Sequence, residues 1–106
     1  MKLLFKCANA ETVRSAIYKL IEDGDLKTWS LTEIENVLYL KHTQQWGDKG
    51  VIKLIVNSKN DSLIAEVFKF KKVTEEVKDF EGYYLGRFCE IILVNFATRF
   101  TAIERG

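Results

Sequence analysis

The chain has 106 residues, of which 47% are hydrophobic and 29% charged, and its formal net charge is +1. A charge this close to zero excludes a strong overall field toward nucleic acid or an anionic membrane, so such binding would need a local patch. The apolar run after Lys2 is too short for a signal-peptide core, and no run reaches the ~18 residues of a membrane span. We therefore expect a cytoplasmic protein, folded as one domain over residues 1–106.

The first predicted elements are a strand and an amphipathic helix. Leu3, Phe5 and Cys7 occupy alternate positions, as in a strand with one buried face. Asn9 is expected to cap the helix that follows, and Gly24 is expected to end it. Between them, apolar residues recur with helical spacing, at Val13, Ala16, Ile17, Leu20 and Ile21.

The middle of the chain predicts an antiparallel meander. A short strand is expected around residues 29–31, and stronger strands are expected over 37–42, 51–56 and 63–71, where β-branched and aromatic residues concentrate. A polar loop over residues 44–50 and a polar turn over 57–62 separate them.

Residues 74–100 predict one long helix. Thr74 is its expected N-cap, and Glu75 and Glu76 would favour the positive end of the helix dipole. Its apolar residues recur at steps of three, four and seven, namely Phe80, Tyr84, Leu85, Phe88, Ile91, Ile92 and Phe96. We interpret the apolar run 91–94 as buried helix, and residues 101–104 as either a short edge strand or an irregular tail.

This order of elements predicts an α+β two-layer sandwich, in which an antiparallel sheet of four or five strands carries two helices on one face. The other face would then be partly open. We expect Lys53, Lys69 and Lys71 on that open face, as solvated residues that protect the sheet.

Few residues suggest catalysis. His42 is the only histidine, and no nucleophile motif, glycine-rich phosphate loop or metal-ligand spacing accompanies it. Cys7 and Cys89 are interpreted as free buried thiols, with a disulfide between them as the alternative that the sequence leaves open. We therefore expect no enzyme activity, no cofactor and no metal.

Binding to a protein is the function that these residues favour. Carboxylates stand out in a connecting segment, and aromatic and polar groups gather at a strand end and on one face of the last helix. The simpler interpretation is that these groups are solvated surface, loop hydrogen bonding and a buried tyrosine. The candidate partner-binding residues are Glu33, Glu35, His42, Gln45, Trp46, Tyr83 and Arg87.

Two segments carry a resemblance. The run Tyr-Leu-Lys-His-Thr-Gln-Gln-Trp at residues 39–46, and Tyr83-Tyr84-Leu85-Gly86 followed by Phe88, resemble segments of small bacterial proteins of similar length and no settled function. Gly47 and Gly50 depart from their pattern. In general character the chain also resembles immunity proteins, which neutralise the toxins of contact-dependent bacterial competition.

These observations leave two functional hypotheses. The preferred one is a protein-binding module, in its most concrete form an immunity protein that occludes the active site of a toxin. The alternative is a nucleic-acid-binding domain, because helix, three strands, helix is also the order of the double-stranded-RNA-binding fold and lysines precede the last helix. Acidic residues at the same place oppose that alternative. The oligomeric state stays open.

Overall fold

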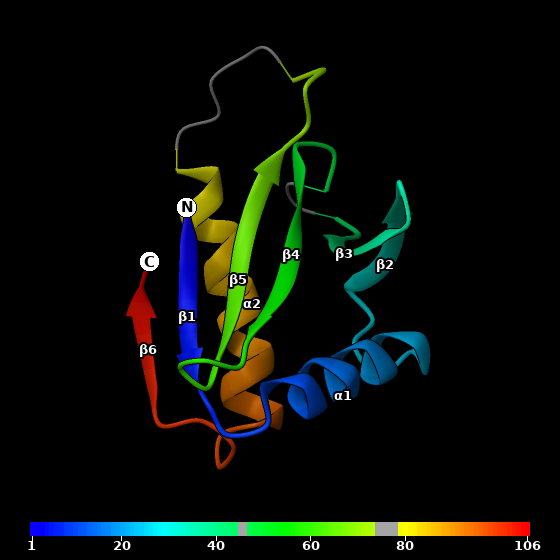
Figure 1. Ribbon diagram of the computed structural model, residues 1–106. Helices are drawn as coiled ribbons and strands as arrows, with labels where there is room; N and C mark the ends of the chain where they lie inside the picture. Colours follow the sequence, from blue (N-terminus) through cyan, green and yellow to red (C-terminus); the bar gives the residue numbers. More distant parts are fainter. Residues whose placement is uncertain (45–46, 74–78) are drawn as a thin grey trace.

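The computed structural model describes residues 1–44, 47–73 and 79–106. Six strands and two helices follow one another in these ranges (Figure 1). Their bounds are β1 Lys2–Lys6, α1 Ala10–Glu22, β2 Trp29–Ile34, β3 Val37–His42, β4 Gly50–Asn57, β5 Ser62–Lys69, α2 Phe80–Asn95 and β6 Ala102–Arg105. The α+β class is confirmed.

The strands form one antiparallel sheet in the order β2-β3-β4-β5-β1-β6. The sheet has six strands, so the prediction of four or five was too low. β6 is the edge strand that the sequence left open, and it pairs with β1 from Leu3↔Arg105 to Lys6↔Ala102. All four residues of β6 are exposed, so neither of its faces is buried. The strand therefore lacks the alternation of apolar and polar residues by which a half-buried strand is recognised.

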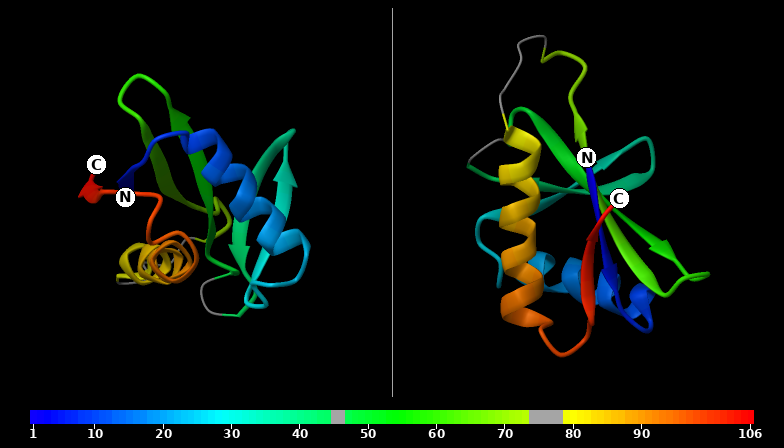
Figure 2. Two further views of the ribbon diagram at one scale, coloured as in Figure 1. Left: turned by 90° about the horizontal axis from the view of Figure 1, so that it is seen from below. Right: turned by 90° about the vertical axis from the view of Figure 1, so that its left-hand side faces the viewer.

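Both helices cover the same face of the sheet, as predicted (Figure 2). The inward side chains of the strands form one hydrophobic cluster with residues of both helices, including Ile17 of α1 and Phe88 of α2. The rings of Phe5 in β1 and Phe88 meet edge to face with centroids 5.5 Å apart. The core therefore lies between one helical layer and one sheet layer.

The outer face of the sheet differs from expectation in its lysines. Lys53 pairs with Glu66, and Val51 pairs with Phe68, so Lys53 shares the outer face with Phe68. Because side chains alternate along a strand, Lys69 belongs to the opposite face, and the prediction for it was wrong. Lys71 follows the end of β5 at Lys69, where alternation no longer assigns a face.

Helix α1 begins and ends where the sequence predicted, although its start differs in detail. Asn9 is the N-cap residue, but it has a left-handed backbone with a φ of 56° and makes no side-chain cap hydrogen bond. At the other end, the N–H of Asp25 donates to the carbonyl of Leu20, and Gly24 has a φ of +80°. Such a left-handed residue after a helix favours glycine, which has no Cβ to clash.

Helix α2 is shorter than the predicted helix 74–100. It ends at Asn95, and residues 74–78, with the expected cap Thr74, lie outside the described residues. The Asn95 side-chain amide donates to the carbonyl of Ile91 at 3.0 Å, and the chain then turns. The N–H of Thr101 donates to the carbonyl of Lys6 at 2.8 Å, so pairing with β1 begins directly after the predicted end of the helix at residue 100. Phe96 is buried as predicted, although it lies just after the end of α2.

Neither helix has the length and apolar character needed to cross a bilayer, as far as the described ranges go.

Candidate functional site

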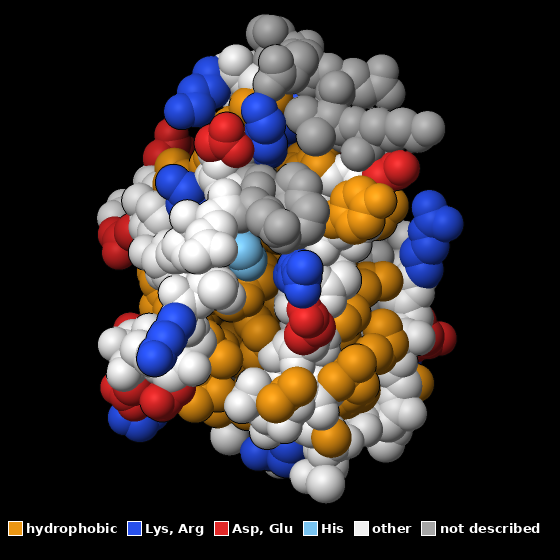
Figure 3. Space-filling view, turned by 180° about the vertical axis from the view of Figure 1, so that it is seen from behind, with side chains coloured by type: hydrophobic (Ala, Val, Ile, Leu, Met, Phe, Trp, Pro, Cys, Tyr) orange, Lys and Arg blue, Asp and Glu red, His pale blue; other side chains and the backbone are white. Residues whose placement is uncertain are grey.

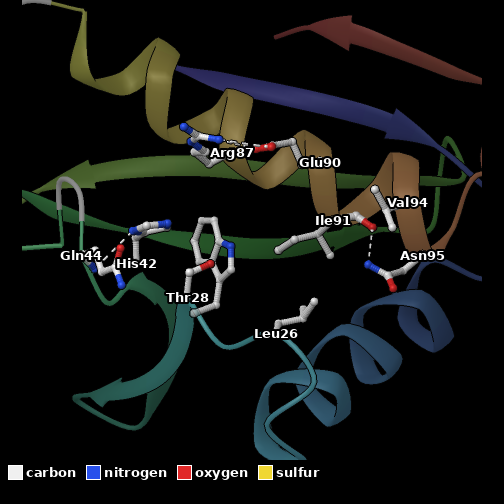
Figure 4. Close-up of a pocket in the computed structure, with 10 residues that line it drawn as sticks. Leu26, Thr28, His42, Gln44, Arg87, Glu90, Ile91, Val94 and Asn95 are labelled. Atoms are coloured by element: carbon white, nitrogen blue, oxygen red, sulfur yellow. Dashed lines mark hydrogen bonds and ion pairs between the residues drawn. The ribbon is translucent and has the colours of Figure 1, made fainter.

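A pocket of about 450 Å³ opens beside the C-terminal half of α2. Seen from behind Figure 1, hydrophobic side chains line a hollow next to the histidine (Figure 3). One wall comes from α2, and the facing wall comes from the segment that joins α1 to β2 (Figure 4). The lining residues are Leu26, Thr28, Trp29, His42, Gln44, Arg87, Glu90, Ile91, Val94 and Asn95.

Trp29 and His42 meet at one end of this pocket because they are paired in the register of β2 with β3. Their rings meet edge to face with centroids 5.1 Å apart, and both residues are buried. The His42 Nδ1 atom accepts a hydrogen bond from the backbone N–H of Gln44 at 3.3 Å. A neutral imidazole that accepts at Nδ1 carries its proton on Nε2, so this ring can present a donor but no second acceptor.

The Tyr84 hydroxyl is hydrogen-bonded to the backbone at this end of the pocket. It accepts the backbone N–H of His42 at 2.9 Å and donates to the carbonyl of Gly50 at 2.9 Å. Burial raises the pKa of the Tyr84 phenol, and the hydrogen bond from His42 partly opposes that rise. Gly50 has no room for a Cβ, which would collide with the Phe68 carbonyl, so glycine is required where β4 passes β5.

The polar rim of the pocket is electrically balanced. Arg87 and Glu90 form an ion pair at 2.9 Å across one turn of α2, and both side chains are about half exposed. At the far end the side-chain amide of Asn95 donates a hydrogen bond to the carbonyl of Ile91, as Figure 4 shows. Thr28 and Gln44 add neutral polar groups. The site therefore pairs an apolar floor with a rim that carries no net charge.

A second hollow of about 320 Å³ lies next to the first. The two share Asn95, and the second lies between α1 and the end of α2. The residues that line it are Ala16, Lys19, Leu20, Asp23, Asn95 and Phe96. We call the two hollows together the α2 groove. Lys19 and Asp23 form an ion pair at 3.4 Å on its far wall, so this end is balanced in charge as well.

The structure brings together two of the predicted site residues. His42 and Arg87 both line the α2 groove, from β3 and α2. Tyr83 lies one turn before Arg87 on α2, is 58% exposed and lines neither hollow. Gln45 and Trp46 lie outside the described residues.

Glu33 and Glu35 lie away from this site. Trp29 and His42 pair at one end of the β2–β3 hairpin, whereas at its other end Glu33 lies near the end of β2 and Glu35 lies in the turn. Five residues of a strand separate those ends by about 16 Å. The acidic segment and the groove are therefore two separate surfaces.

Sequence reasoning missed several walls of the groove, most clearly Val94. The run 91–94 was interpreted as buried, but Leu93 is 56% and Val94 is 79% exposed. Four consecutive residues span more than one helical turn, so they cannot all face the same core. That geometric limit was the available signal for an exposed aliphatic surface on α2.

The described residues hold no cluster of three or more His, Cys, Asp or Glu suited to a metal ion.

Lys72, one of the lysines before α2, lies with its ammonium 5.7 Å from the centre of the Phe70 ring. Four strands separate the two helices, rather than the three of the double-stranded-RNA-binding order.

Comparisons with known protein families, curated proteins and solved structures found no match.

Proposed function

We propose that this protein is a protein-binding module that docks its partner on the α2 groove. The observation that carries the proposal is Val94, an aliphatic side chain 79% exposed on the lip of an apolar hollow. A single exposed aliphatic residue is ordinary, but one that continues the floor of a groove marks a surface that gains from being covered.

The groove also offers anchoring residues of the kinds that interfaces use. Trp29 supplies an aromatic floor, held rigidly by the ring of Tyr84 at 5.8 Å and by that of His42. Arg87 stands on the rim with its side chain 49% exposed. Tryptophan, tyrosine and arginine are enriched among the residues that contribute most to binding. Rigid support lowers the entropy lost when a partner docks.

An immunity protein that occludes a toxin is the most concrete form of this proposal. The supporting features are the small single sheet-and-helix unit and the residues that led to the protein-binding hypothesis. Co-expression with the captured partner tests this form. A toxin should arrest growth when expressed alone and lose that effect when this chain is present, whereas a partner without toxicity would exclude it.

The docking surface is tested with two matched substitutions on α2. Val94→Lys places a charge on the groove, whereas Leu93→Lys places the same charge on a neighbouring exposed residue that lines neither hollow. Partners captured by crosslinking should be purified and titrated calorimetrically. We expect one-to-one binding that Val94→Lys weakens at least about tenfold, or ~1.4 kcal/mol, and that Leu93→Lys leaves unchanged.

If no purified protein binds the wild type one to one, the protein-binding proposal fails. If a protein binds both variants equally, the docking surface lies elsewhere on the molecule.

A further inference from the structure

We infer that the occupant of the α2 groove is an amphipathic α-helix of the partner, with an uncharged apolar face. This inference rests on the proposed function and specifies the kind of segment that the same site takes. It follows from the shape of the groove, from the state of its backbone groups and from its charge.

The shape of the groove fits a short helix. The two hollows share Asn95, and the first hollow alone follows α2 from Arg87 to Asn95. Eight residues of helix rise about 12 Å, which is a little over two turns. Its walls are α2 on one side and the end of α1 with the following segment on the other (Figure 4). A third helix packs well between two such walls, because its ridges fit the grooves between their side chains.

The backbone around the groove offers little to an extended peptide. The carbonyl of Leu26 accepts the N–H of Trp29 at 3.1 Å, and that of Thr28 accepts the N–H of Thr43 at 2.8 Å. The Leu20 carbonyl accepts from Asp25 at 3.0 Å. An extended segment would bury its own N–H and C=O groups here without strand partners, at a cost for each unpaired group. A helix satisfies its backbone internally, so it avoids that cost.

The charges of the groove favour an occupant with a neutral contact face. Arg87–Glu90 lies at one end and Lys19–Asp23 at the other, and each is a balanced ion pair. Between them the surface is apolar or neutral, with Ile91 of α2 extending toward Leu26 and Val94 also lining the hollow (Figure 4). A charged contact face would lose hydration without gaining an unpaired counter-charge. Apolar residues at positions i, i+3, i+4 and i+7 of the partner helix would fill the groove.

The experiment uses displayed peptide libraries against the full chain, because no partner needs to be known. One library places apolar residues at i, i+3, i+4 and i+7 of ~16-residue peptides, and a second has the same composition in strict alternation. Selected peptides are then measured by fluorescence anisotropy against wild type, Val94→Lys and Leu93→Lys. Circular dichroism follows whether each peptide gains helix on binding.

We expect binders from the helical library only. Val94→Lys should weaken them about tenfold or more and Leu93→Lys less than about twofold, and a proline at the peptide centre should abolish binding. Raising NaCl from about 50 to 500 mM should change affinity less than about threefold, because no net charge is involved. Binders from the alternating library alone, or equal binding to both variants, would overturn the inference.

This outcome is separable from that of the proposed function. A natural partner that binds one to one but through an extended segment would refute the helical occupant and leave the protein-binding module intact. If helical peptides bind at Val94 but the chain has no protein partner that binds one to one, the helical occupant of the groove is supported and the proposed function is refuted.

Discussion

The Tyr84 hydroxyl stands between His42 and Gly50 in place of a direct strand-to-strand hydrogen bond. β3 and β4 pair at Leu40↔Ile52, so His42 and Gly50 would be the next opposed residues in an antiparallel ladder. Instead the phenol accepts from the N–H of His42 and donates to the carbonyl of Gly50, both at 2.9 Å. A helix side chain thus completes the sheet where β3 leaves β4, and it fixes the end of the groove.

Tyr84→Phe should therefore destabilise the fold by about 1–3 kcal/mol, since it leaves a buried N–H and a buried C=O without their partner. Urea denaturation of both proteins measures the difference in free energy of unfolding. Tyr39→Phe is the control, because among the described residues the Tyr39 hydroxyl makes no hydrogen bond. We expect it to cost less than about 0.5 kcal/mol, and equal losses in the two variants would contradict the bridge.

The core is tested at Phe88, which is fully buried against Phe5 and Trp29. Phe88→Ala should cost about 3–5 kcal/mol, because it opens a large cavity between helix and sheet. Phe68→Ala removes the same ring from a residue that is 42% exposed on the outer face, and it should cost clearly less. Thermal or urea unfolding compares them. A loss below roughly 1 kcal/mol for Phe88→Ala would contradict its place in the core.

The elements that could be predicted from the sequence are those in which apolar residues recur with a regular period. α1 has one clear apolar stripe, and β1, β3, β4 and β5 concentrate apolar residues, so their places were predicted within a few residues. β6 has no buried residue, and its existence depends on pairing with β1, ~100 positions earlier in the chain. Phe96 and Phe100 pack on the core from the turn after α2, so their spacing imitated a longer helix.

The site was predictable only in part, for a related reason. His42 and Arg87 have distinctive side chains and were named from the sequence. Leu26 and Val94 are ordinary aliphatic residues from segments far apart in the chain, and only the packing of α2 beside the segment before β2 makes them walls of one groove. Local pattern cannot show such a meeting.

The β2–β3 turn holds backbone strain that a substitution should relieve. Ile34 pairs with Val37, so the loop has two residues, Glu35 and Asn36, with φ values of 51° and 65°. This left-handed region is costly for glutamate and better tolerated by asparagine. Glu35→Asn should stabilise the protein by about 0.5–1 kcal/mol in urea denaturation. Glu33→Asn makes the same charge change within β2 and should not stabilise, so a gain in both variants would point to charge rather than strain.

Stability should fall in alkaline solution because buried acids resist ionisation. Burial raises the pKa of the Cys7 and Cys89 thiols above their ordinary 9.0, and that of the Tyr84 phenol above 10.0. The unfolded chain therefore loses these protons first, so the stabilisation is complete below about pH 8 and declines as pH rises through 9 and beyond. Urea denaturation at about pH 7, 8, 9 and 10 measures the slope. Cys7→Ala with Cys89→Ala should make that slope shallower, and an unchanged slope would exclude the thiols as its source.

Reversal of Glu33 and Glu35 to lysine separates steering by charge from docking in the groove. Both residues are exposed at the far end of the β2–β3 hairpin from His42, so the double variant should keep its fold, with a change in stability within about 0.5 kcal/mol. It should bind neutral helical peptides as tightly as wild type. With a basic partner it should associate more slowly at low ionic strength, and the difference should shrink as salt is added. Stopped-flow association at two salt concentrations measures this. Equal rates at both would remove the two carboxylates from the interface, whereas weaker peptide binding would contradict their separation from the groove.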